Sequence, residues 1–433
     1  MAIAFSGGLD STVLLHLAHA YAQHHGLVLH AFHVHHGLSP HADQWLEHCR
    51  QQCAGLDIVF DARRVVLDNK RGGVEEAARQ LRYAALGDMC RAYDVDLLLT
   101  AHHQDDQAET VLLQLLRGSG VAGLCGMDNV NRAVDLLGHA SLWMGRPLLA
   151  VARETLANWA EQEVLSYVED ESNADPRYAR NALRHHVMPA LAHDFPGFQQ
   201  RFARTAQHAQ STQRLLIELA SEDLAACLEG RAIDLERLKG LSRERIDNML
   251  RYWFGSRGVR MPSTAWLAEM RAQLFEAKDD AQLCVTHADC EIHRHRNRIF
   301  MTRRYDSEAV PKPLSFRWQG ETSLRFPTFG GVLDVEEAEE GMDADWLSQQ
   351  SMTLALRSGG ERLKLGWNRP SRSLKAHYQQ ADVPAWERPR LPLVFAGTQL
   401  LYAAGIGMDC HALASGQGQR FRFDWRFDDE TAC

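Results

Sequence analysis

Residues 1–12 have the sequence MAIAFSGGLDST, and this short stretch decides the fold of the N-terminal part of the chain. The apolar segment Ile3–Phe5 predicts a brief strand, and residues 12–25 predict a helix with one apolar face. Gly7 and Gly8 lie between them, where a chain without β-carbons can turn sharply and approach a ligand closely. The start of the helix offers unpaired N–H groups and a positive dipole end. The stretch therefore predicts a strand–loop–helix unit that binds phosphate oxygens.

Apolar strand patterns and helical periodicity alternate through the first two hundred residues. The predicted strands are residues 27–34, 58–66, 95–101 and 165–168, and the predicted helices are residues 41–53, 74–93, 106–116 and 153–163. Such alternation predicts βαβ units and a parallel sheet covered on both faces. We therefore expect an α/β nucleotide-binding domain over residues 1–195.

The pattern changes after this region. Residues 198–278 give a helical signal without strand rhythm, with Ser263 as a helix cap, and residues 284–303 predict a strand pair. We therefore predict a mostly helical domain over residues 196–312, followed by a small α+β domain over residues 313–433.

An acidic run without basic residues lies at positions 334–345 in the last of these domains. Such a run is expected to form an exposed, solvated loop.

Composition narrows the class of protein. The chain has 433 residues, 45% of them hydrophobic and 24% charged, and no apolar run approaches the roughly 18 residues of a membrane span. The N-terminus resembles neither a signal nor a transit peptide. Nine cysteines without a C-x-x-C motif argue against a disulfide framework and favour a reducing, cytoplasmic location. The net charge of −9 excludes a uniformly basic nucleic-acid-binding coat, so nucleic acid would bind to local basic patches.

A second motif, TAHHQDDQAET at residues 100–110, follows an apolar strand. Open α/β sheets bind ligands at the carboxyl ends of their strands. Asp105 and Asp106 repel each other unless a cation intervenes, and hard oxygen ligands beside a nucleotide favour Mg²⁺. One acid could instead cap the following helix, but a cap does not account for His103 and Glu109 as well.

Two further motifs are less specific by themselves. Residues 73–83, GVEEAARQLRY, place Glu75 and Arg79 on one helix face with Arg82 and Tyr83, which also suits an ordinary surface ion pair. Residues 170–184, DESNADPRYARNALR, form a polar, arginine-bearing segment that leads into a helix. Alone, it indicates only that an anion could bind there.

Together these motifs resemble a known family. The SGGLDS segment resembles the PP-loop of the N-type ATP pyrophosphatases, and all four motifs in this order resemble the tRNA(Ile)-lysidine synthetase family. HHGL at residues 35–38, RPLL at 146–149 and the stretch 354–407 extend the resemblance to nearly the whole chain. It implies that ATP adenylates the 2-keto oxygen of the wobble cytidine in a CAU-anticodon tRNA(Ile). The amine of free L-lysine then displaces AMP to form lysidine.

The resemblance also implies roles for individual residues. The nucleotide would lie on the loop and near one histidine, at Ser6, Gly7, Gly8, Leu9, Asp10, Ser11, Thr12 and His36. Catalysis would involve Asp10, His103, Asp106, Arg79, Asn181 and Arg184. The magnesium candidates are Asp10, Asp105 and Asp106. The lysine ammonium would meet an acid, for which Glu109 and Asp170 are candidates.

Basic residues toward the C-terminus are candidates for tRNA binding. They are Arg362, Lys364, Arg372, Lys375 and Arg388, in a net-positive segment interleaved with Trp367, Tyr378 and Trp386. Basic segments with aromatic residues suit RNA backbone and stacking contacts. A second arginine cluster, at residues 294–304, could contact RNA or form a solvated edge strand. A homodimer is a candidate assembly for the protein.

Other functions were weighed against this one. A PP-loop tRNA sulfur transferase would need a reactive cysteine pair or an iron–sulfur cluster, which the dispersed cysteines disfavour. A PP-loop amidotransferase would need a glutaminase domain or an ammonia partner. A catalytically idle tRNA-binding protein would not need the intact acids Asp10, Asp105 and Asp106. A zinc site at His33 and His35 lacks cysteine partners at the usual spacing.

Overall fold

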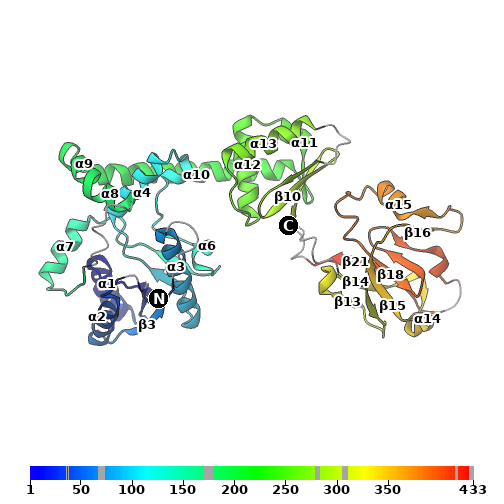
Figure 1. Cartoon of the computed structure of the whole chain (residues 1–433), viewed down its shortest axis with the longest axis horizontal. Coiled ribbons are helices and arrows are strands. Elements are labelled where there is room, and N and C mark those ends of the chain that lie inside the picture. The colour runs from blue at the N-terminus through cyan, green and yellow to red at the C-terminus, as the bar shows by residue number, and fades with distance from the viewer. Residues whose placement is uncertain are drawn as a thin grey trace. The chain divides into compact units, whose positions relative to one another are not determined.

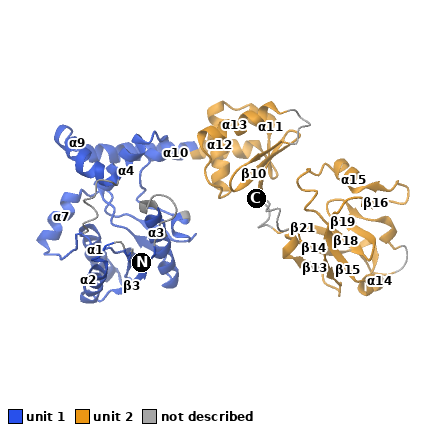
Figure 2. Ribbon diagram, viewed as in Figure 1, with its two compact units in different colours: residues 1–216 blue, residues 217–433 orange. Residues whose placement is uncertain are grey.

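The computed structural model describes residues 1–35, 37, 39–66, 74–169, 179–277, 283–304, 311–414 and 418–428. They belong to two compact units, residues 1–216 and 217–433 (Figure 2). Among the described residues, no helix combines the length and apolar character needed to cross a membrane.

A six-stranded sheet forms the centre of the first unit, in the order β3-β2-β1-β4-β6-β5. The first five of these strands run parallel, and β5 pairs antiparallel with β6 at one edge. The strands are β1 (Ala2–Ala4), β2 (His30–His35), β3 (Val59–Arg64), β4 (Leu97–Leu99), β5 (Val130–Asn131) and β6 (Trp143–Gly145). The predicted parallel sheet is confirmed.

Helices cover this sheet and extend beyond it (Figure 1). They are α1 (Leu9–His25), α2 (Ala42–Gly55), α3 (Val74–Ala92), α4 (Gln104–Leu116), α5 (Val121–Leu124), α6 (Val134–Leu137), α7 (Arg153–Gln162), α8 (Ala179–Ala182), the π-helical turn Leu183–Val187 and α9 (Met188–Asp194). Ile3 packs in an apolar cluster with α1, α2 and α7, whereas Ala2 packs in another with α3. Because neighbouring strand residues face opposite sides, one core lies on each face of the sheet.

The predicted strand over residues 165–168 is wrong. This segment is irregular, and Leu165 packs partly buried against the core from a loop. Its last residue touches the glycine-rich loop instead, since the Val168 N–H donates to the Gly7 carbonyl at 2.9 Å. Strand β6, which the sequence analysis did not predict, supplies the parallel neighbour of β4.

Helix α10 (Phe198–Cys227) belongs to both units, because the boundary between them falls within it. Beyond it, α11 (Leu235–Lys239), α12 (Arg243–Ser256) and α13 (Thr264–Glu276) share a core with a sheet in the order β7-β8-β11-β10-β9. Its strands are β7 (Leu228–Glu229), β8 (Ala232–Asp234), β9 (Leu283–Thr286), β10 (Cys290–His295) and β11 (Arg298–Arg303).

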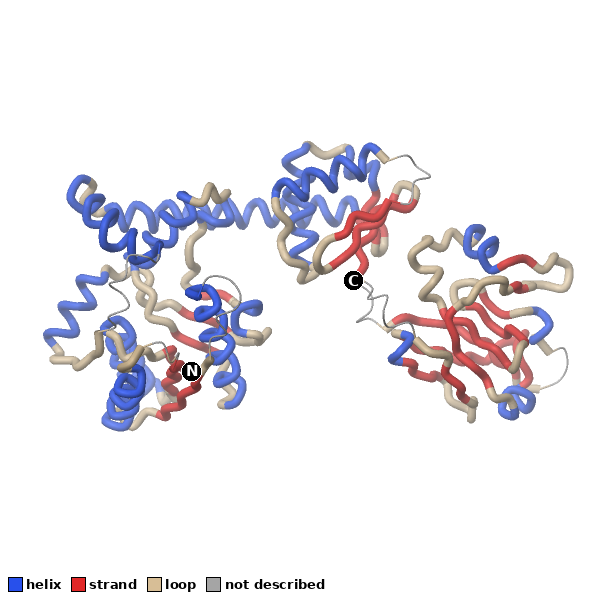
Figure 3. The backbone as a smooth tube through the Cα atoms, in the orientation of Figure 1, coloured by secondary structure: helices blue, strands red, loops and turns tan. Residues whose placement is uncertain are grey.

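Two sequence expectations for this region need correction. Strands β7 and β8 interrupt the expected all-helical segment, and three strands replace the expected pair over residues 284–303 (Figure 3). A short hairpin such as β7–β8 is stabilised by its partner strand β11, which a local pattern does not reveal. The predicted cap is confirmed, since Ser263 Oγ accepts the Trp266 N–H at 3.2 Å.

The C-terminal part is built from antiparallel sheets around one core. One sheet has the order β12-β15-β18-β19-β20, a second has β13-β14-β21, and β16 pairs with β17. The strands are β12 (Leu314–Phe316), β13 (Ser323–Phe326), β14 (Gly331–Asp343), β15 (Met352–Leu356), β16 (Arg362–Leu363), β17 (Arg372–Ser373), β18 (Pro392–Ala396), β19 (Gln399–Ala403), β20 (Gly407–Met408) and β21 (Arg420–Phe427). Helices α14 (Ala344–Gln349) and α15 (Leu374–Gln380) complete the expected α+β composition.

The acidic run is a strand, not the expected loop. It forms most of β14, in which Leu333 and Val335 face the core while acidic side chains alternate toward the outside. The paired strand β21 supplies arginines to those acids, because Arg426 Nε lies 3.1 Å from Asp334 Oδ2. The four glutamates Glu336, Glu337, Glu339 and Glu340 nevertheless remain exposed, so the expected exposure of the run is confirmed although the expected loop is not.

Candidate active site

The glycine-rich loop leaves the amides at the start of α1 open to a ligand. Gly8 precedes the helix and offers no side-chain cap, while its carbonyl accepts the Thr12 N–H at 2.9 Å. Ser6 Oγ lies 3.0 Å from Ser11 Oγ, so the two hydroxyls brace the turn. The first N–H groups of a helix carry partial positive charge and suit phosphate oxygens. The predicted phosphate loop therefore has the geometry that its chemistry requires.

Gly7 has a conformation and a packing environment that exclude a side chain. Its φ is +86°, and a β-carbon added there would lie 2.8 Å from Cys49 Sγ. Only glycine adopts this region without strain and also allows α2 to pack this closely. The loop is thus held from both sides, by α2 and by the Val168 N–H.

His103 organises the acids at the start of α4. It is the N-cap of the helix: its Nδ1 accepts the Asp106 N–H at 3.4 Å, and its own N–H donates to Asp106 Oδ2 at 3.1 Å. The alternative in which an aspartate caps this helix alone is therefore replaced by a reciprocal capping box. The cap fixes the directions of both side chains at the carboxyl end of β4.

Asp10 of α1 joins this group. His103 Nε2 lies 3.6 Å from Asp10 Oδ2 and 3.3 Å from Asp106 Oδ2, and His103 Nδ1 lies 3.8 Å from Asp105 Oδ2. Burial acts to lower the pKa of His103, but the contact with Asp10 and the nearby carboxylates outweigh it and raise that pKa. For Asp10, burial acts to raise the pKa, yet His103, Arg153 and Arg184 hold it below its usual value.

The three aspartates differ in whether a carboxylate oxygen still lacks a hydrogen bond and could bind a cation. Asp10 Oδ1 is buried without a hydrogen-bond partner, as expected of an oxygen that serves a cation. Asp106 directs its Oδ1 to Arg184 at 3.3 Å. Asp105 is committed elsewhere, since it accepts the Arg153 N–H at 2.9 Å and the Gln199 amide at 3.3 Å. Asp105 and Asp106 each accept two hydrogen bonds, but Asp106 shares His103 Nε2 with Asp10 whereas Asp105 lies at Nδ1. Asp10 and Asp106 are therefore the better-placed pair for one hard divalent cation.

Two arginines enclose the far side of the cluster. Arg184 Nε donates to Glu109 Oε1 at 2.7 Å, and Arg180 Nε donates to Glu109 Oε2 at 2.8 Å. Burial acts to lower the pKa of Arg184, but its bonds to Glu109 and the neighbouring acids raise it. Because both carboxylate oxygens of Glu109 are bonded to guanidinium groups, a lysine ammonium at Glu109 would have to displace an arginine.

Arg79 lies in a different group of residues. Its guanidinium sits over the Tyr83 ring at 5.0 Å, and Arg79, Arg146 and Arg180 contribute to the field at His102. Burial, together with these positive charges, lowers the pKa of His102 well below its usual value. Among the described side chains, no hydrogen bond or ion pair links Arg79 with the acids around His103, so its predicted role stays a prediction.

Several predicted residues cannot be placed in the site. His36 and Asp170 lie outside the described residues, and Asn181 lies on α8 between Arg180 and the turn that carries Arg184. Their roles stay predictions.

Two arginines of the site were not predicted from the sequence. Arg153 Nε lies 3.9 Å from Asp10 Oδ1, and Arg180 binds Glu109. Arg180 stood within the quoted arginine-bearing motif, whereas only the fold brings Arg153 to the cluster.

The predicted tRNA-binding residues are mostly exposed in the second unit. Arg362 and Arg372 lie on paired strands, Lys375 is exposed on α15, and the Lys364 ammonium sits 5.6 Å from the Trp367 ring centre. Arg388 is only half-buried and donates to the Val383 carbonyl at 2.9 Å.

Some neighbouring side chains depart from the RNA-binding expectation. Tyr378 is fully buried and donates to the Ala404 carbonyl, so it cannot stack on a base. Arg294, from the second arginine cluster, is also buried and donates to the carbonyls of Leu274 and Arg296. Both residues serve the fold.

Comparisons with known proteins agree with this geometry. Residues 1–191 match the family model of the PP-loop domain, residues 233–300 that of the TilS substrate binding domain, and residues 352–425 that of the TilS substrate C-terminal domain. The parallel sheet, the open loop and the matched domain define a PP-loop protein that uses ATP.

Relatives with curated names specify the family. The chain is 41% identical to a tRNA(Ile)-lysidine synthase of Burkholderia pseudomallei over 99% of this chain and 93% of that protein. It is 40% identical to one of Ralstonia nicotianae over 96% and 91%. The chain belongs to the tRNA(Ile)-lysidine synthase family. A U34-tRNA thiolase structure from Methanococcus maripaludis aligns with TM-score 0.40 and 18% identity, covering 48% of this chain and 71% of that one.

Proposed function

We propose that the protein ligates free L-lysine to the 2-position of the wobble cytidine in tRNA(Ile) with a CAU anticodon. ATP adenylates the base oxygen with release of pyrophosphate, and attack by the lysine amine then expels AMP. The observation that carries this proposal is the juxtaposition of Asp10, His103 and Asp106 beside the open amides of α1. Full-length relatives with this name support it.

The loop and the acids would divide the binding of ATP between them. The amides after Gly8 suit the pyrophosphate portion, and Ser6, Ser11 and Thr12 add hydroxyl groups at the same turn. We propose that Asp10 and Asp106 hold Mg²⁺, with Asp10 Oδ1, which accepts no hydrogen bond, as the principal ligand. The ion would neutralise charge that develops on the leaving pyrophosphate. Asp105 would instead hold the start of α7 through the Arg153 N–H.

Arginines would stabilise the charge that develops at the α-phosphate while the adenylyl group is transferred. Arg184 is fixed by Glu109 and Asp106, so its guanidinium is oriented before the nucleotide binds. Fixed donors of this kind stabilise a transition state without reorganising at the moment of reaction. Arg79 and Asn181 remain proposed contacts of the nucleotide or the base.

Variants of Glu109 and Asp170, the two proposed lysine-binding acids, test which of them holds the substrate. Glu109→Gln is expected to impair the steps that use Arg180 and Arg184, because it loosens both guanidinium groups. If Glu109 instead holds the ammonium, the KM for lysine would rise alone while the KM for ATP stayed constant. Asp170→Asn provides the comparison, since it is the other predicted lysine ligand.

The target cytidine lies in a single-stranded anticodon loop, where a base can be splayed out and recognised on its edges. We propose that Arg362, Lys364, Arg372, Lys375 and Arg388 bind tRNA phosphates. We further propose that the segments 1–195, 196–312 and 313–433 act as catalytic, linking and recognition domains. The enzyme would act in the cytoplasm, and a homodimer remains an assembly to test by light scattering.

The decisive experiment incubates the protein with ATP, labelled lysine and a tRNA(Ile) transcript, and scores label on the RNA. Label is expected on this transcript and not on a methionine tRNA with the same anticodon. Pyrophosphate release should require the tRNA, whereas a sulfur transferase or an amidotransferase would leave lysine unincorporated. A tRNA-binding protein without activity would release no pyrophosphate at all.

A further inference from the structure

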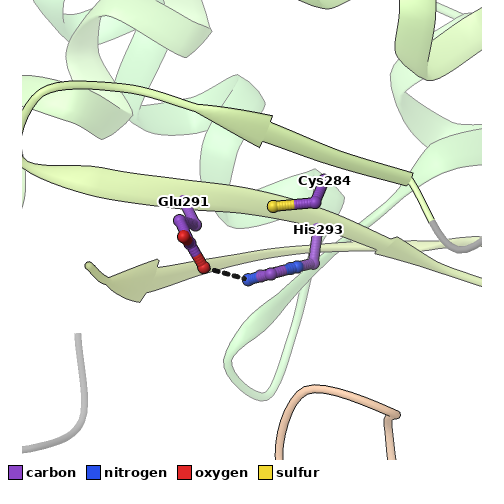
Figure 4. Close-up of side chains that lie close together, drawn as sticks. All are labelled: Cys284, Glu291 and His293. Carbon is purple, nitrogen blue, oxygen red and sulfur yellow. Dashed lines mark ion pairs between the residues drawn. The ribbon is translucent and has the colours of Figure 1, made fainter. Parts of the chain in front are cut away.

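A polar cluster with mixed ligand chemistry lies on the edge of the sheet in the second unit. In the antiparallel register of β9 and β10, Cys284 is directly opposite His293, and Glu291 lies two residues before His293 on the same face. Side chains opposite each other across strands have β-carbons about 5 Å apart. The backbone pairing alone therefore brings a thiol, a carboxylate and an imidazole together, far along the chain from the proposed active-site acids (Figure 4).

The distances within this cluster suit a small transition-metal ion. One ligand atom from each of the three side chains lies within 4.8 Å of the other two. His293 Nε2 and Glu291 Oε2 are 3.3 Å apart. Two ligands bound to tetrahedral zinc at about 2.0–2.1 Å lie about 3.3 Å from each other. The imidazole–carboxylate pair thus already has the required spacing, and a rotation of the exposed Cys284 side chain brings its sulfur to the third position.

Aromatic neighbours hold the His293 ring in place. Its ring stacks on Trp386 with centroids 4.2 Å apart and planes 12° apart, and Phe300 packs on the same tryptophan at 5.5 Å. Thr302 Oγ1 lies 3.1 Å from His293 Nε2. The aromatic wall fixes the ring, and a bound ion would take Nε2 from the Thr302 hydroxyl.

The charge of the cluster favours a cation. Burial lowers the pKa of His293 and outweighs the neighbouring Glu291 carboxylate, which acts to raise it. Burial and the Glu291 carboxylate both raise the pKa of the Cys284 thiol. A divalent ion would neutralise the carboxylate and allow the thiol to ionise, as coordination to a metal does.

We propose that Cys284, Glu291 and His293 form a binding site for a zinc-class divalent ion. The three protein ligands leave a fourth position for water, and thiolate, imidazole and carboxylate together are a donor set that zinc accepts. The bound ion ties the edge strand β9 to β10 and fixes His293 against Trp386. The site is separate from the proposed magnesium site, since its donors include sulfur and nitrogen.

Cobalt substitution tests the site on the full-length protein. Co²⁺ added to metal-free, reduced protein is expected to give visible bands of tetrahedral geometry and a near-ultraviolet thiolate-to-cobalt band. Zinc should abolish both signals by displacement. Cys284→Ser should remove the thiolate band, and Glu291→Gln should weaken zinc binding more than about 100-fold, beyond the 10–100-fold typical of outer-shell changes. Thr302→Val should not weaken zinc binding, because it removes a hydroxyl that competes with the ion for His293 Nε2.

Controls distinguish this site from other thiols and from misfolding. Cys125→Ser alters a half-exposed cysteine of the first unit and should leave the cobalt spectrum unchanged. Cys284 is exposed and Glu291 half-buried, so both variants should keep the wild-type circular dichroism spectrum. The proposal is overturned if the wild type gives no thiolate band, or if Cys284→Ser binds Co²⁺ and Zn²⁺ as the wild type does.

Discussion

The two charged regions of this protein are built in opposite ways. Around His103, Glu109 is buried and most of the other acids and arginines are partly buried, and they are bonded to one another, as the two guanidinium groups on Glu109 show. On the β16–β17 hairpin and α15, Arg362, Arg372 and Lys375 are exposed. A buried network acts through fixed geometry at short range, whereas exposed charges act through a field that salt screens. We therefore expect substitutions in the first region to change chemistry and those in the second to change affinity.

The largest effect is expected from Asp106→Asn. It removes charge from a proposed magnesium ligand and from the partner of Arg184, and should lower the rate of pyrophosphate release about 10³-fold. Binding of tRNA, measured by filter retention, should change little. Asp105→Asn is the matched control and should cost about tenfold at most, because Asp105 lies at His103 Nδ1, away from Asp10, and the change only weakens its hydrogen bonds to Arg153 and Gln199. A larger loss at Asp105 would reverse the metal assignment.

Gly7→Ala should have the next largest effect. The added methyl group would meet Cys49 Sγ at 2.8 Å in a backbone of positive φ, which is expected to cost about 1–3 kcal/mol of stability. ATP affinity, measured by calorimetry, should fall because the loop amides move. Gly26→Ala is the control at the end of the same helix, where φ is +63° and no atom lies within 4 Å. Equal losses of ATP affinity in both variants would contradict the proposed role of the loop.

A smaller and purely electrostatic effect is expected in the second region. Arg372→Ala and Lys375→Ala should each weaken tRNA binding severalfold and reduce the slope of log affinity against log salt by about 0.7–0.9. The rate at saturating tRNA should stay constant. Arg426→Ala serves as the control, because this arginine is already paired with Asp334. A fall in the saturated rate would place these residues in catalysis and end the contrast between the regions.

The smallest effect concerns pH. In protein without nucleotide or Mg²⁺, the raised pKa of His103 gives a stabilisation that is present below about pH 6.5 and is lost as pH rises through that raised pKa. The lowered pKa of Asp10 gives one that is present above about pH 4 and is lost as pH falls through the lowered value. Thermal unfolding of His103→Asn should show a flatter dependence above pH 6.5. An unchanged profile would mean that the His103–Asp10 contact is not formed in solution.

The sequence by itself determined those features of the molecule that depend on residues close together in the chain. Two glycines between a strand and a helix suffice for an anion loop, because the amides that bind phosphate belong to the same few residues. The acids after β4 were likewise predictable, since parallel strands end at one edge of a sheet. The alternation of strands and helices gave the α/β class for the same reason: its period is local.

Only the tertiary structure decided which side chains meet across long separations. It bonded Asp105 to the start of α7 and left Asp10 Oδ1 without a hydrogen bond, although neighbouring acids look alike in sequence. It joined Arg180 to Glu109, buried Arg294, and converted the acidic run into β14. Charge and burial compete at each of these positions. The outcome depends on partners from distant segments, which local periodicity does not encode.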